Sequence, residues 1–318
     1  MDVSKNDTRQ NIGGMAGNYR VFLALIGAAA SAMAQPASLA PVLTRAAEEA
    51  AAFEQGIVKT LAEETLEQSA VMGPPRFQPR VGQQAVQAPK PRTRKRVIVS
   101  EYSVGTLKKS KSKDLVEFRQ VISVDGVAVQ TQASARHALS TNVLSENDRA
   151  RKRMLEDYAS YGLVDIATDY GLILLAFSRQ GMANMQFTEE PETKIGGVAA
   201  RSIAWKQTSA AAGELEFHGR QAARLPLSGR LLARRSDLLP LRVEVWAEDT
   251  VGKQKIRDEA AVDYTQSEHG FLTPAAVVHR HLVDGNVTVE NRYTYKTFRL
   301  FQAKAEIEYE TGPAVKKK

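Results

Sequence analysis

Two histidines separated by one residue, His279 and His281, have the spacing that places both imidazoles on one face of a β-strand. With a third ligand such as Asp284 or Glu290, such a pair can hold a metal ion. The alternative is that they are two partly exposed strand histidines on either side of Arg280, and this interpretation is strongly favoured. We therefore expect neither a metal nor a cofactor.

Other catalytic constellations are weak in this sequence. Carboxylate pairs occur at Glu259 with Asp263 and at Asp165 with Asp169, but 36 of the 318 residues are acidic, so such pairs arise by chance. The glycines form neither a Gly-x-x-x-x-Gly-Lys phosphate loop nor a Gly-x-Ser-x-Gly elbow. The chain has no cysteine, which excludes disulfides, thiolate zinc sites and cysteine nucleophiles. We expect no catalytic residues, and a hydrolase is the least favoured class.

Three aromatic residues on expected strands, Trp205, Phe217 and Trp246, are the candidates for lining a ligand cavity. For each of them, ordinary packing within a sheet is the simpler role. We therefore retain the three as a ligand-binding hypothesis for a hydrophobic molecule.

A basic segment accounts for the formal net charge of +7, because residues 85–113 contain nine Lys or Arg against the single acidic residue Glu101. A solvated loop is the favoured interpretation, and a patch that binds an anionic surface is the alternative. The residues that would form this patch are Lys90, Arg92, Arg94, Lys95 and Arg96. Nucleic acid is not an expected partner, since stacking aromatics other than Tyr102 are scarce there.

The N-terminal region has the pattern of a secretory signal. Basic residues up to Arg20 precede an apolar run over 21–30, and an Ala-x-Ala site predicts cleavage between Ala34 and Gln35. The apolar run is half of the ~20 residues needed to cross a bilayer. We expect residues 1–34 to be removed and the mature protein to be soluble in the periplasm or secreted. The alternatives left open are a buried alanine-rich helix and a start at Met15.

The elements that must position these residues begin with helices. The Ala- and Glu-rich stretch from Thr44 to Glu67 predicts one amphipathic helix within an N-terminal region at 35–70. Prolines then predict a Pro-rich and basic linker at 71–113 that leads into the first strands, at 97–104 and 115–124. Asp125-Gly126 predicts a tight turn, and Asp148 predicts the start of a helix that reaches Tyr158. The apolar run 170–177 fits either a helix or a buried strand.

The C-terminal part is dominated by apolar and polar residues that alternate with a period of two. Residues 241–248, 287–296 and 303–310 all show this pattern, and turn signals separate them. We predict a meander of six or seven strands over 195–310, followed by a basic tail at 311–318. Helices before residue 195 and strands after it indicate an α+β fold.

Several of these segments resemble the LolA/RseB-like superfamily of exported proteins. They are Leu61-Ala-Glu-Glu-Thr-Leu-Glu67, Phe118-Arg-Gln-Val-Ile-Ser-Val-Asp-Gly126, Gly196-Gly-Val198, Leu238-Leu-Pro-Leu-Arg-Val243 and Tyr293-Thr-Tyr-Lys-Thr-Phe-Arg-Leu-Phe301. The resemblance implies an antiparallel, unclosed β half-barrel, here over residues 97–310, whose concave face is covered by helices. It also implies a non-enzymatic carrier or sensor that binds a hydrophobic or lipid-like ligand, a lipoprotein or another envelope protein.

Two functions follow as hypotheses. The first is an exported binding protein that holds a hydrophobic or lipid-like ligand in its concave face. The alternative is an interaction or structural module of the envelope whose basic linker makes a peripheral contact with an anionic membrane or cell wall.

Overall fold

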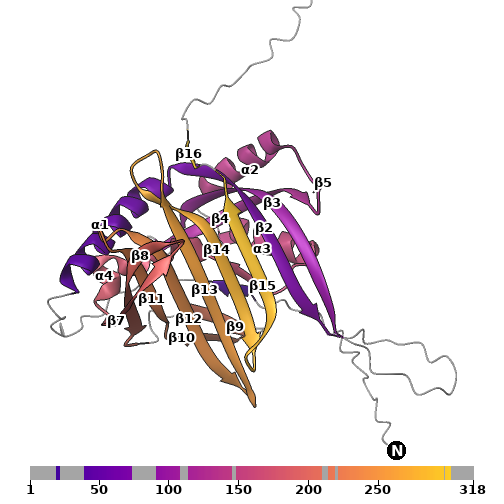
Figure 1. Cartoon of the computed structure of the whole chain (residues 1–318). Coiled ribbons are helices and arrows are strands. Elements are labelled where there is room, and N and C mark those ends of the chain that lie inside the picture. Colours follow the sequence, from indigo (N-terminus) through magenta and orange to yellow (C-terminus); the bar gives the residue numbers. More distant parts are fainter. Residues whose placement is uncertain are drawn as a thin grey trace, which may run out of the picture.

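The computed structural model describes residues 19–21, 39–73, 91–107, 114–144, 148–209, 214–218, 221–296 and 298–301. Most of the described chain lies in one antiparallel sheet (Figure 1). From one edge to the other, its strands are β5 (Val127–Ala128), β4 (Asp114–Val124), β3 (Arg92–Leu107), β2 (Thr60–Met72), β15 (Asn286–Tyr295), β14 (Leu272–Val283), β13 (Gln254–Gln266), β12 (Pro240–Val251), β11 (Ser228–Arg234), β8 (Val198–Gln207) and β7 (Met185–Ile195), with β16 (Arg299–Leu300) also paired to β2. The path ends at β5 and β7, so the sheet is an unclosed half-barrel.

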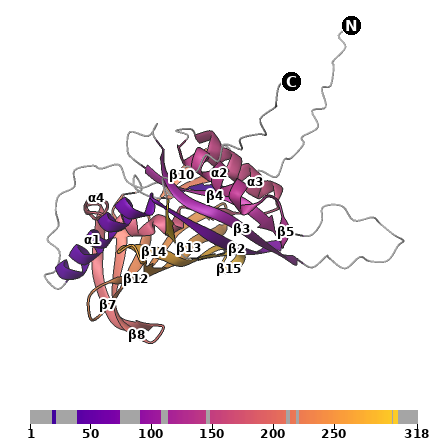
Figure 2. The same cartoon turned by 90° about the horizontal axis from the view of Figure 1, so that it is seen from above.

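The helices lie at the two ends of this sheet (Figures 1 and 2). Helix α1 (Ala40–Ile57) and the short α4 (Arg179–Met182) are beside β7 and β8, while α2 (Gln132–Leu144) and α3 (Asp148–Ser160) are beside β3 to β5. A 3₁₀ helix, η1 (Tyr170–Phe177), connects the two groups through the interior. The α+β half-barrel with a covered concave face is thereby confirmed. Among the described residues, no helix is long and apolar enough to cross a bilayer.

A second, smaller sheet has the order β10 (Gln221–Leu225), β9 (Glu214–His218), β1 (Tyr19–Val21) and β6 (Ile166–Thr168). Strand β1 lies inside the segment that the sequence predicts to be a cleaved leader. The removal of residues 1–34 remains a prediction, as does the division of the chain into regions, apart from the first helix and the linker, whose bounds differ in the structure.

The prediction of one helix from Thr44 to Glu67 is wrong beyond Ile57. Helix α1 has Pro41 in its first turn and buries a stripe that includes Val42, Ala46 and Phe53. From Thr60 onward, every second residue of β2 is buried up to Ala70, which is the period of a strand. Pairing with β3 on one side and β15 on the other overrides the helix-favouring Ala and Glu composition.

The prediction of a linker over 71–113 is also wrong in part, because Arg92–Leu107 forms the long strand β3. The other early predictions are confirmed. Strands cover 97–104 and 115–124, and the turn between β4 and β5 has the positive φ angles of Asp125 (49°) and Gly126 (81°).

The C-terminal meander is confirmed for the main sheet, where β8 and β11 to β15 lie side by side in chain order and β11 to β15 are joined by short turns. Strands β9 and β10, which come between β8 and β11 in the chain, belong to the smaller sheet. In β12, Val243, Val245 and Ala247 are buried, as the alternation predicts. The strand predicted at 303–310 and the basic tail lie outside the described residues.

The run 170–177 is neither an α-helix nor a strand. It is η1, and all eight of its residues are buried. Asp169 before it has a left-handed backbone (φ 69°), which turns the chain from β6 into the interior. Both α1 and the strands β4 and β12 to β14 pack against η1, so this segment covers the concave face of the sheet.

Packing between β8 and β12 depends on Gly229 of β11, which faces Trp205 in the sheet. A Cβ atom there would lie 2.1 Å from the Glu244 carbonyl oxygen and 2.5 Å from the Trp205 ring. We expect Gly229→Ala to lower the free energy of unfolding by about 3 kcal/mol, since backbone cannot yield as a side chain can. In contrast, a Cβ atom on Gly73 meets nothing within 4 Å, and Gly73→Ala should stay within about 0.5 kcal/mol of wild type in urea unfolding. Equal effects would contradict the packing argument.

Candidate functional site

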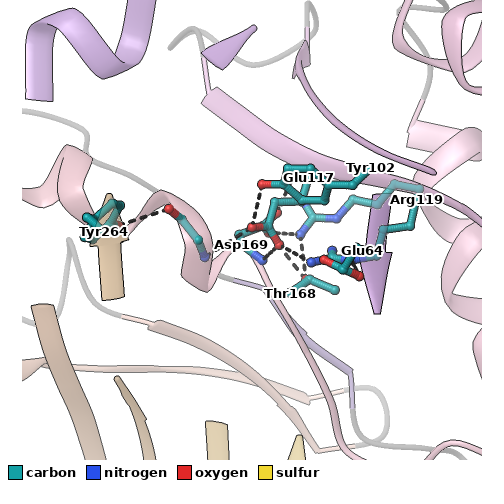
Figure 3. A network of polar contacts seen from close by, with 9 residues as sticks. Glu64, Tyr102, Glu117, Arg119, Thr168, Asp169 and Tyr264 are labelled. Carbon is teal, nitrogen blue, oxygen red and sulfur yellow. Dashed lines mark hydrogen bonds and ion pairs between the residues drawn. The ribbon is translucent and has the colours of Figure 1, made fainter. Parts of the chain in front are cut away.

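A cluster of charged side chains lies inside the half-barrel, at the β2–β4 end of its concave face (Figure 3). Arg119 of β4 donates from Nε to Glu64 Oε1 at 2.6 Å and from Nη2 to Glu117 Oε2 at 2.8 Å. The side chains of these three residues are at most 2% exposed. The guanidinium also lies 5.3 Å from the ring centroids of both Tyr102 and Tyr293. Arg119 of β4 therefore forms a buried ion pair with Glu64 of β2 and a buried cation–π contact with Tyr293 of β15.

Glu117 connects this cluster to the interior segment. Its carboxylate accepts hydrogen bonds from the backbone N–H groups of Asp169 (2.7 Å) and Gly171 (3.1 Å), and from the Tyr102 hydroxyl (3.0 Å). In return, the Glu117 N–H donates to Asp169 Oδ1 at 2.8 Å, and Arg151 of α3 forms an ion pair with the Asp169 carboxylate. Glu117 thus holds the first turn of η1 against β4.

Tyr264 of β13 holds η1 from the other side (Figure 3). Its hydroxyl donates to the Gly171 carbonyl oxygen and accepts from the Leu174 N–H, both at 3.0 Å. Phe53 of α1 packs edge-on against the Tyr264 ring, with centroids 6.1 Å apart. The cover of the concave face is therefore anchored by two side chains, Glu117 and Tyr264, that belong to distant strands.

Burial sets the protonation behaviour of the cluster. Desolvation raises the pKa of Glu64 above its usual value of 4.5, although Arg119 opposes the shift. Desolvation likewise raises the pKa of Asp169, against the opposing charge of Arg151. For Arg119, burial acts to lower the pKa, but Glu117 and Glu64 outweigh it and raise the pKa well above its usual value. The guanidinium is therefore charged at every accessible pH.

The histidine pair lies in a neighbouring part of the same face, and its interpretation as partly exposed strand histidines is wrong. His279 is 0% and His281 8% exposed, and their ring nitrogens lie 3.3 and 3.0 Å from Asp258 Oδ1. Tyr170 stacks on His279 with ring centroids 5.1 Å apart. The pair alternates in phase with the buried Val277, and this apolar neighbour is the sequence signal that places it inside.

The other ligands considered for a metal are engaged elsewhere. Glu290 accepts from Arg280 at 2.7 Å, and Asp284 accepts from the Lys255 N–H at 2.9 Å. Within the described ranges, no group of three or more His, Asp or Glu side chains is placed to hold a metal ion. Of the acid pairs, Asp263 binds Arg242 at 2.5 Å and Glu259 binds Arg257 at 3.0 Å.

The three aromatic candidates do not come together. Trp205 is 2% exposed and packs inside against Phe177 of η1, with ring centroids 6.0 Å apart. Trp246 lies on the opposite face, between the guanidinium groups of Arg257 (4.9 Å) and Arg230 (5.8 Å), in a shallow outer depression of about 410 Å³. Phe217 is in the smaller sheet, opposite Ala222. Of the three, Trp205 is the one that lines the concave face.

The basic residues of the candidate patch divide by strand phase. Arg94 and Arg96 share the face of the buried Ile98, and they donate to the carbonyl oxygens of Gly162 and Tyr161 at the end of α3. Arg92 and Lys95 are exposed, whereas Lys90 lies outside the described residues, as do Ala34 and Gln35. The patch remains a prediction, with Arg92 and Lys95 as its exposed members within the described part of the chain.

Sequence reasoning missed Glu64, Glu117, Arg119 and Asp169 as a group. They come from a segment predicted to be helical, from one strand with both faces buried, and from a loop. A weak signal was available in β4, where Glu117 and Arg119 alternate with Val116 and Phe118.

The raised pKa of Glu64 predicts a pH dependence of stability. The folded state binds the Glu64 proton more tightly than the unfolded chain does, so protonation of Glu64 stabilises the fold fully below about pH 4.5, and this stabilisation is lost as the pH rises. Glu64→Gln cannot bind or release this proton. The free energy of unfolding of the variant, relative to that of wild type, should therefore increase with pH, by about 1.4 kcal/mol for each tenfold difference in proton affinity between the folded and unfolded states. Urea unfolding between pH 4 and 8 measures this difference.

Glu290→Gln is the matched control with the opposite sign. Burial acts to raise the pKa of Glu290, but hydrogen bonds from Arg280 and Arg292 outweigh it and lower the pKa. The stability of this variant relative to wild type should therefore fall as the pH rises. Parallel curves for the two variants would contradict the assignment of the Glu64 shift to burial.

The contacts of Arg94 and Arg96 predict that they stabilise the end of α3. Because their guanidinium groups bind carbonyl oxygens at a helix C-terminus, Arg94→Ala or Arg96→Ala should each lower the free energy of unfolding by about 1–2 kcal/mol. Lys95→Ala, between them and exposed, should change it by less than about 0.5 kcal/mol. Equal losses for all three would show that the contacts do not stabilise the fold.

Similarity to known proteins is found among solved structures. No family model and no curated protein matches the sequence. Among solved structures, a domain from Vibrio parahaemolyticus named for outer membrane lipoprotein sorting has 9% identity and a TM-score of 0.37, over 83% of this chain and 94% of that one. A DUF1329 family protein from Desulfovibrio piger has 10% identity and a TM-score of 0.34, over 85% and 98%. A LolA superfamily protein from Nitrosomonas europaea has 9% identity and a TM-score of 0.29, over 83% and 93%. The resemblance of the sequence to the LolA/RseB-like superfamily stays a prediction.

Proposed function

We propose that this protein is an exported, non-enzymatic binding protein that holds a hydrophobic or lipid-like ligand, or an acylated envelope protein, against the concave face of its half-barrel. The observation that carries the proposal is the apolar part of this face and its cover. Ile203, Leu231, Val243 and Val262 from four neighbouring strands are all fully buried there, and what lies over them is a short segment rather than further sheet.

The cover is suited to rearrangement. A 3₁₀ helix of eight residues is long for its type, and its hydrogen-bond geometry is poorer than that of an α-helix. Glu117 and Tyr264 supply its side-chain anchors to the sheet. Displacement of such a segment exposes a concave apolar surface, which is the usual form of a ligand site. The leader pattern supports a location in the periplasm or outside the cell, in soluble form after cleavage.

The first test uses what the protein retains during purification. Organic extraction of the purified protein, followed by mass spectrometry, should find an acyl-containing molecule, and added fatty acids or lipopeptides should raise the unfolding temperature. The absence of both a retained lipid and a thermal shift would contradict the proposal.

The second test locates the ligand, using the fact that the chain has two tryptophans. In Trp246→Phe the remaining Trp205 lies on the concave face, and in Trp205→Phe the remaining Trp246 lies on the outer face. A monoacylglycerol with a brominated acyl chain should quench the emission of Trp205 and leave that of Trp246 nearly unchanged. Stronger quenching of Trp246 would place the ligand outside and overturn the assignment of the concave face.

A further inference from the structure

The chain between α3 and η1, residues 161–169, is bound to the concave face by side chains of neighbouring strands. We name this segment the strap, because it leads directly into η1. On β2, Gln68 binds the N–H of Val164 at 3.0 Å and its carbonyl oxygen at 2.8 Å. On β15, Asn291 donates to the Asp165 carbonyl oxygen at 3.0 Å. Gln68 and Asn291 are at most 3% exposed, so these contacts belong to the interior.

The orientation of both amide groups follows from their backbone partners. A backbone N–H only donates and a carbonyl oxygen only accepts, so Gln68 presents Oε1 to the Val164 N–H and Nε2 to the Val164 carbonyl oxygen. The same Nε2 donates to Asn291 Oδ1 at 2.7 Å. Asn291 therefore presents Nδ2, which is only a donor, to its other partners.

One of these partners is His279 of β14. Asn291 Nδ2 lies 3.2 Å from His279 Nδ1, so Nδ1 accepts this hydrogen bond and carries no proton. The other ring nitrogen, Nε2, then carries the proton and donates to Asp258 Oδ1 at 3.3 Å. The two amides thus define one state of His279, which is the neutral imidazole with its proton on Nε2.

A second proton on His279 conflicts with this arrangement. The new N–H on Nδ1 and the NH₂ group of Asn291 would be two donors facing each other across 3.2 Å. Asn291 cannot reverse its amide, because Oδ1 is bound by Gln68 and Nδ2 by the Asp165 carbonyl oxygen. Protonation of His279 therefore breaks its contact with Asn291, and the same amides hold the strap.

The surroundings of His279 favour such a proton electrostatically. The titratable groups that face it are Asp258 from β13 and, from η1, the Tyr170 ring, which stacks on the imidazole with centroids 5.1 Å apart. From β15 the facing group is the uncharged Asn291. His281 shares Asp258, with Nδ1 3.0 Å from Oδ1. A carboxylate favours the charged form of an imidazole, and histidine is the side chain that changes charge between pH 5 and 8.

We propose that His279 is a proton-operated latch, which holds the strap and η1 on the concave face when it is neutral and releases them when it takes up a proton from solvent. This rests on the proposed function and deepens it, because it adds that the ligand gains access to the concave face on mild acidification.

The first experiment measures opening without a ligand, by hydrogen exchange of backbone amides at about pH 7.5 and about pH 5, corrected for the intrinsic exchange rate. In wild type, the strap and η1 should lose protection about tenfold at the lower pH, the effect of one hydrogen bond, whereas β12 and β13 keep theirs. In His279→Gln, the amide oxygen can accept from Asn291 but takes up no proton, so protection should not change with pH.

His269→Gln is the matched control for this experiment. His269 also titrates, but it contacts Phe298 and Phe271 in another part of the chain, so this variant should respond to pH as wild type does. An equal loss of protection in wild type and His279→Gln would assign the response to other groups, such as the buried carboxylate of Asp169, and would overturn the latch. Unchanged protection in wild type would also overturn it.

A second readout uses the wild-type protein and does not depend on whether a variant folds. In ¹⁵N NMR, the His279 ring should be neutral and protonated on Nε2 at about pH 7.5, and it should become charged over the pH range in which the strap loses protection. A proton on Nδ1 at the higher pH, or a charged ring under a strap that is still protected, would overturn the latch.

The last experiment separates the latch from the proposed function. In the Trp246→Phe protein, a monoacylglycerol with a brominated acyl chain should quench Trp205 with an association rate about tenfold higher at the lower pH, because the open state is more populated. Adding His279→Gln should remove this difference. Quenching at equal rates would overturn control of ligand access while the carrier stands. Loss of protection at low pH without quenching at either pH would overturn the proposed function, and the latch would stand.

Discussion

The buried guanidinium of Arg119 is the interaction on which the interior depends. It is surrounded by Glu64, Glu117 and two tyrosine rings, and through Glu117 it fixes the position of Asp169 and hence the start of η1. Buried ion pairs do not by themselves stabilise a fold, because desolvation offsets their attraction. Removal of one partner is different, since it leaves an uncompensated charge at a cost of about 3–5 kcal/mol. The cluster therefore specifies how β2, β4, α3 and η1 are arranged relative to one another.

This constraint divides the concave face into two parts with different physical character. Around β2 to β4 the face contains charges and hydroxyls, and around β8 to β13 it contains aliphatic side chains and Trp205. The segment from Asp169 to Phe177 follows the same order. Its first backbone N–H groups donate to the Glu117 carboxylate, and its last side chain, Phe177, packs against Trp205 in the apolar part of the face. Gly171 is required at the junction, because a Cβ atom there would lie 2.5 Å from Glu117 Oε1 and displace the carboxylate that anchors the segment.

The sequence predicts the parts of this fold in which local pattern and tertiary environment agree. In β12, one face is buried and the other solvated, so the alternation of Val243 and Val245 with polar residues is sufficient to predict the strand and its buried face. In β4 the alternation of apolar and polar residues does not indicate the site, because both faces of the strand are buried. Phe118 packs on Leu139 of α2, and Arg119 points inside. Strand β2 is missed because its composition favours a helix and its inner face includes Glu64 and Gln68. No local pattern indicates that such residues meet across β15, β2 and β4.

The same charges that fix the cover also limit how firmly it can close. With η1 in place, the carboxylate of Asp169 is kept from water, and burial raises its pKa. Displacement of the cover returns water to this carboxylate, so its hydration favours opening. Exposure of Leu172, Ile173 and Phe177 opposes it, at about 25 cal/mol for each Å² of apolar surface. A ligand with an apolar chain would replace the apolar contacts that this face loses when η1 leaves. Closed and liganded states can then lie close in free energy, as reversible binding requires.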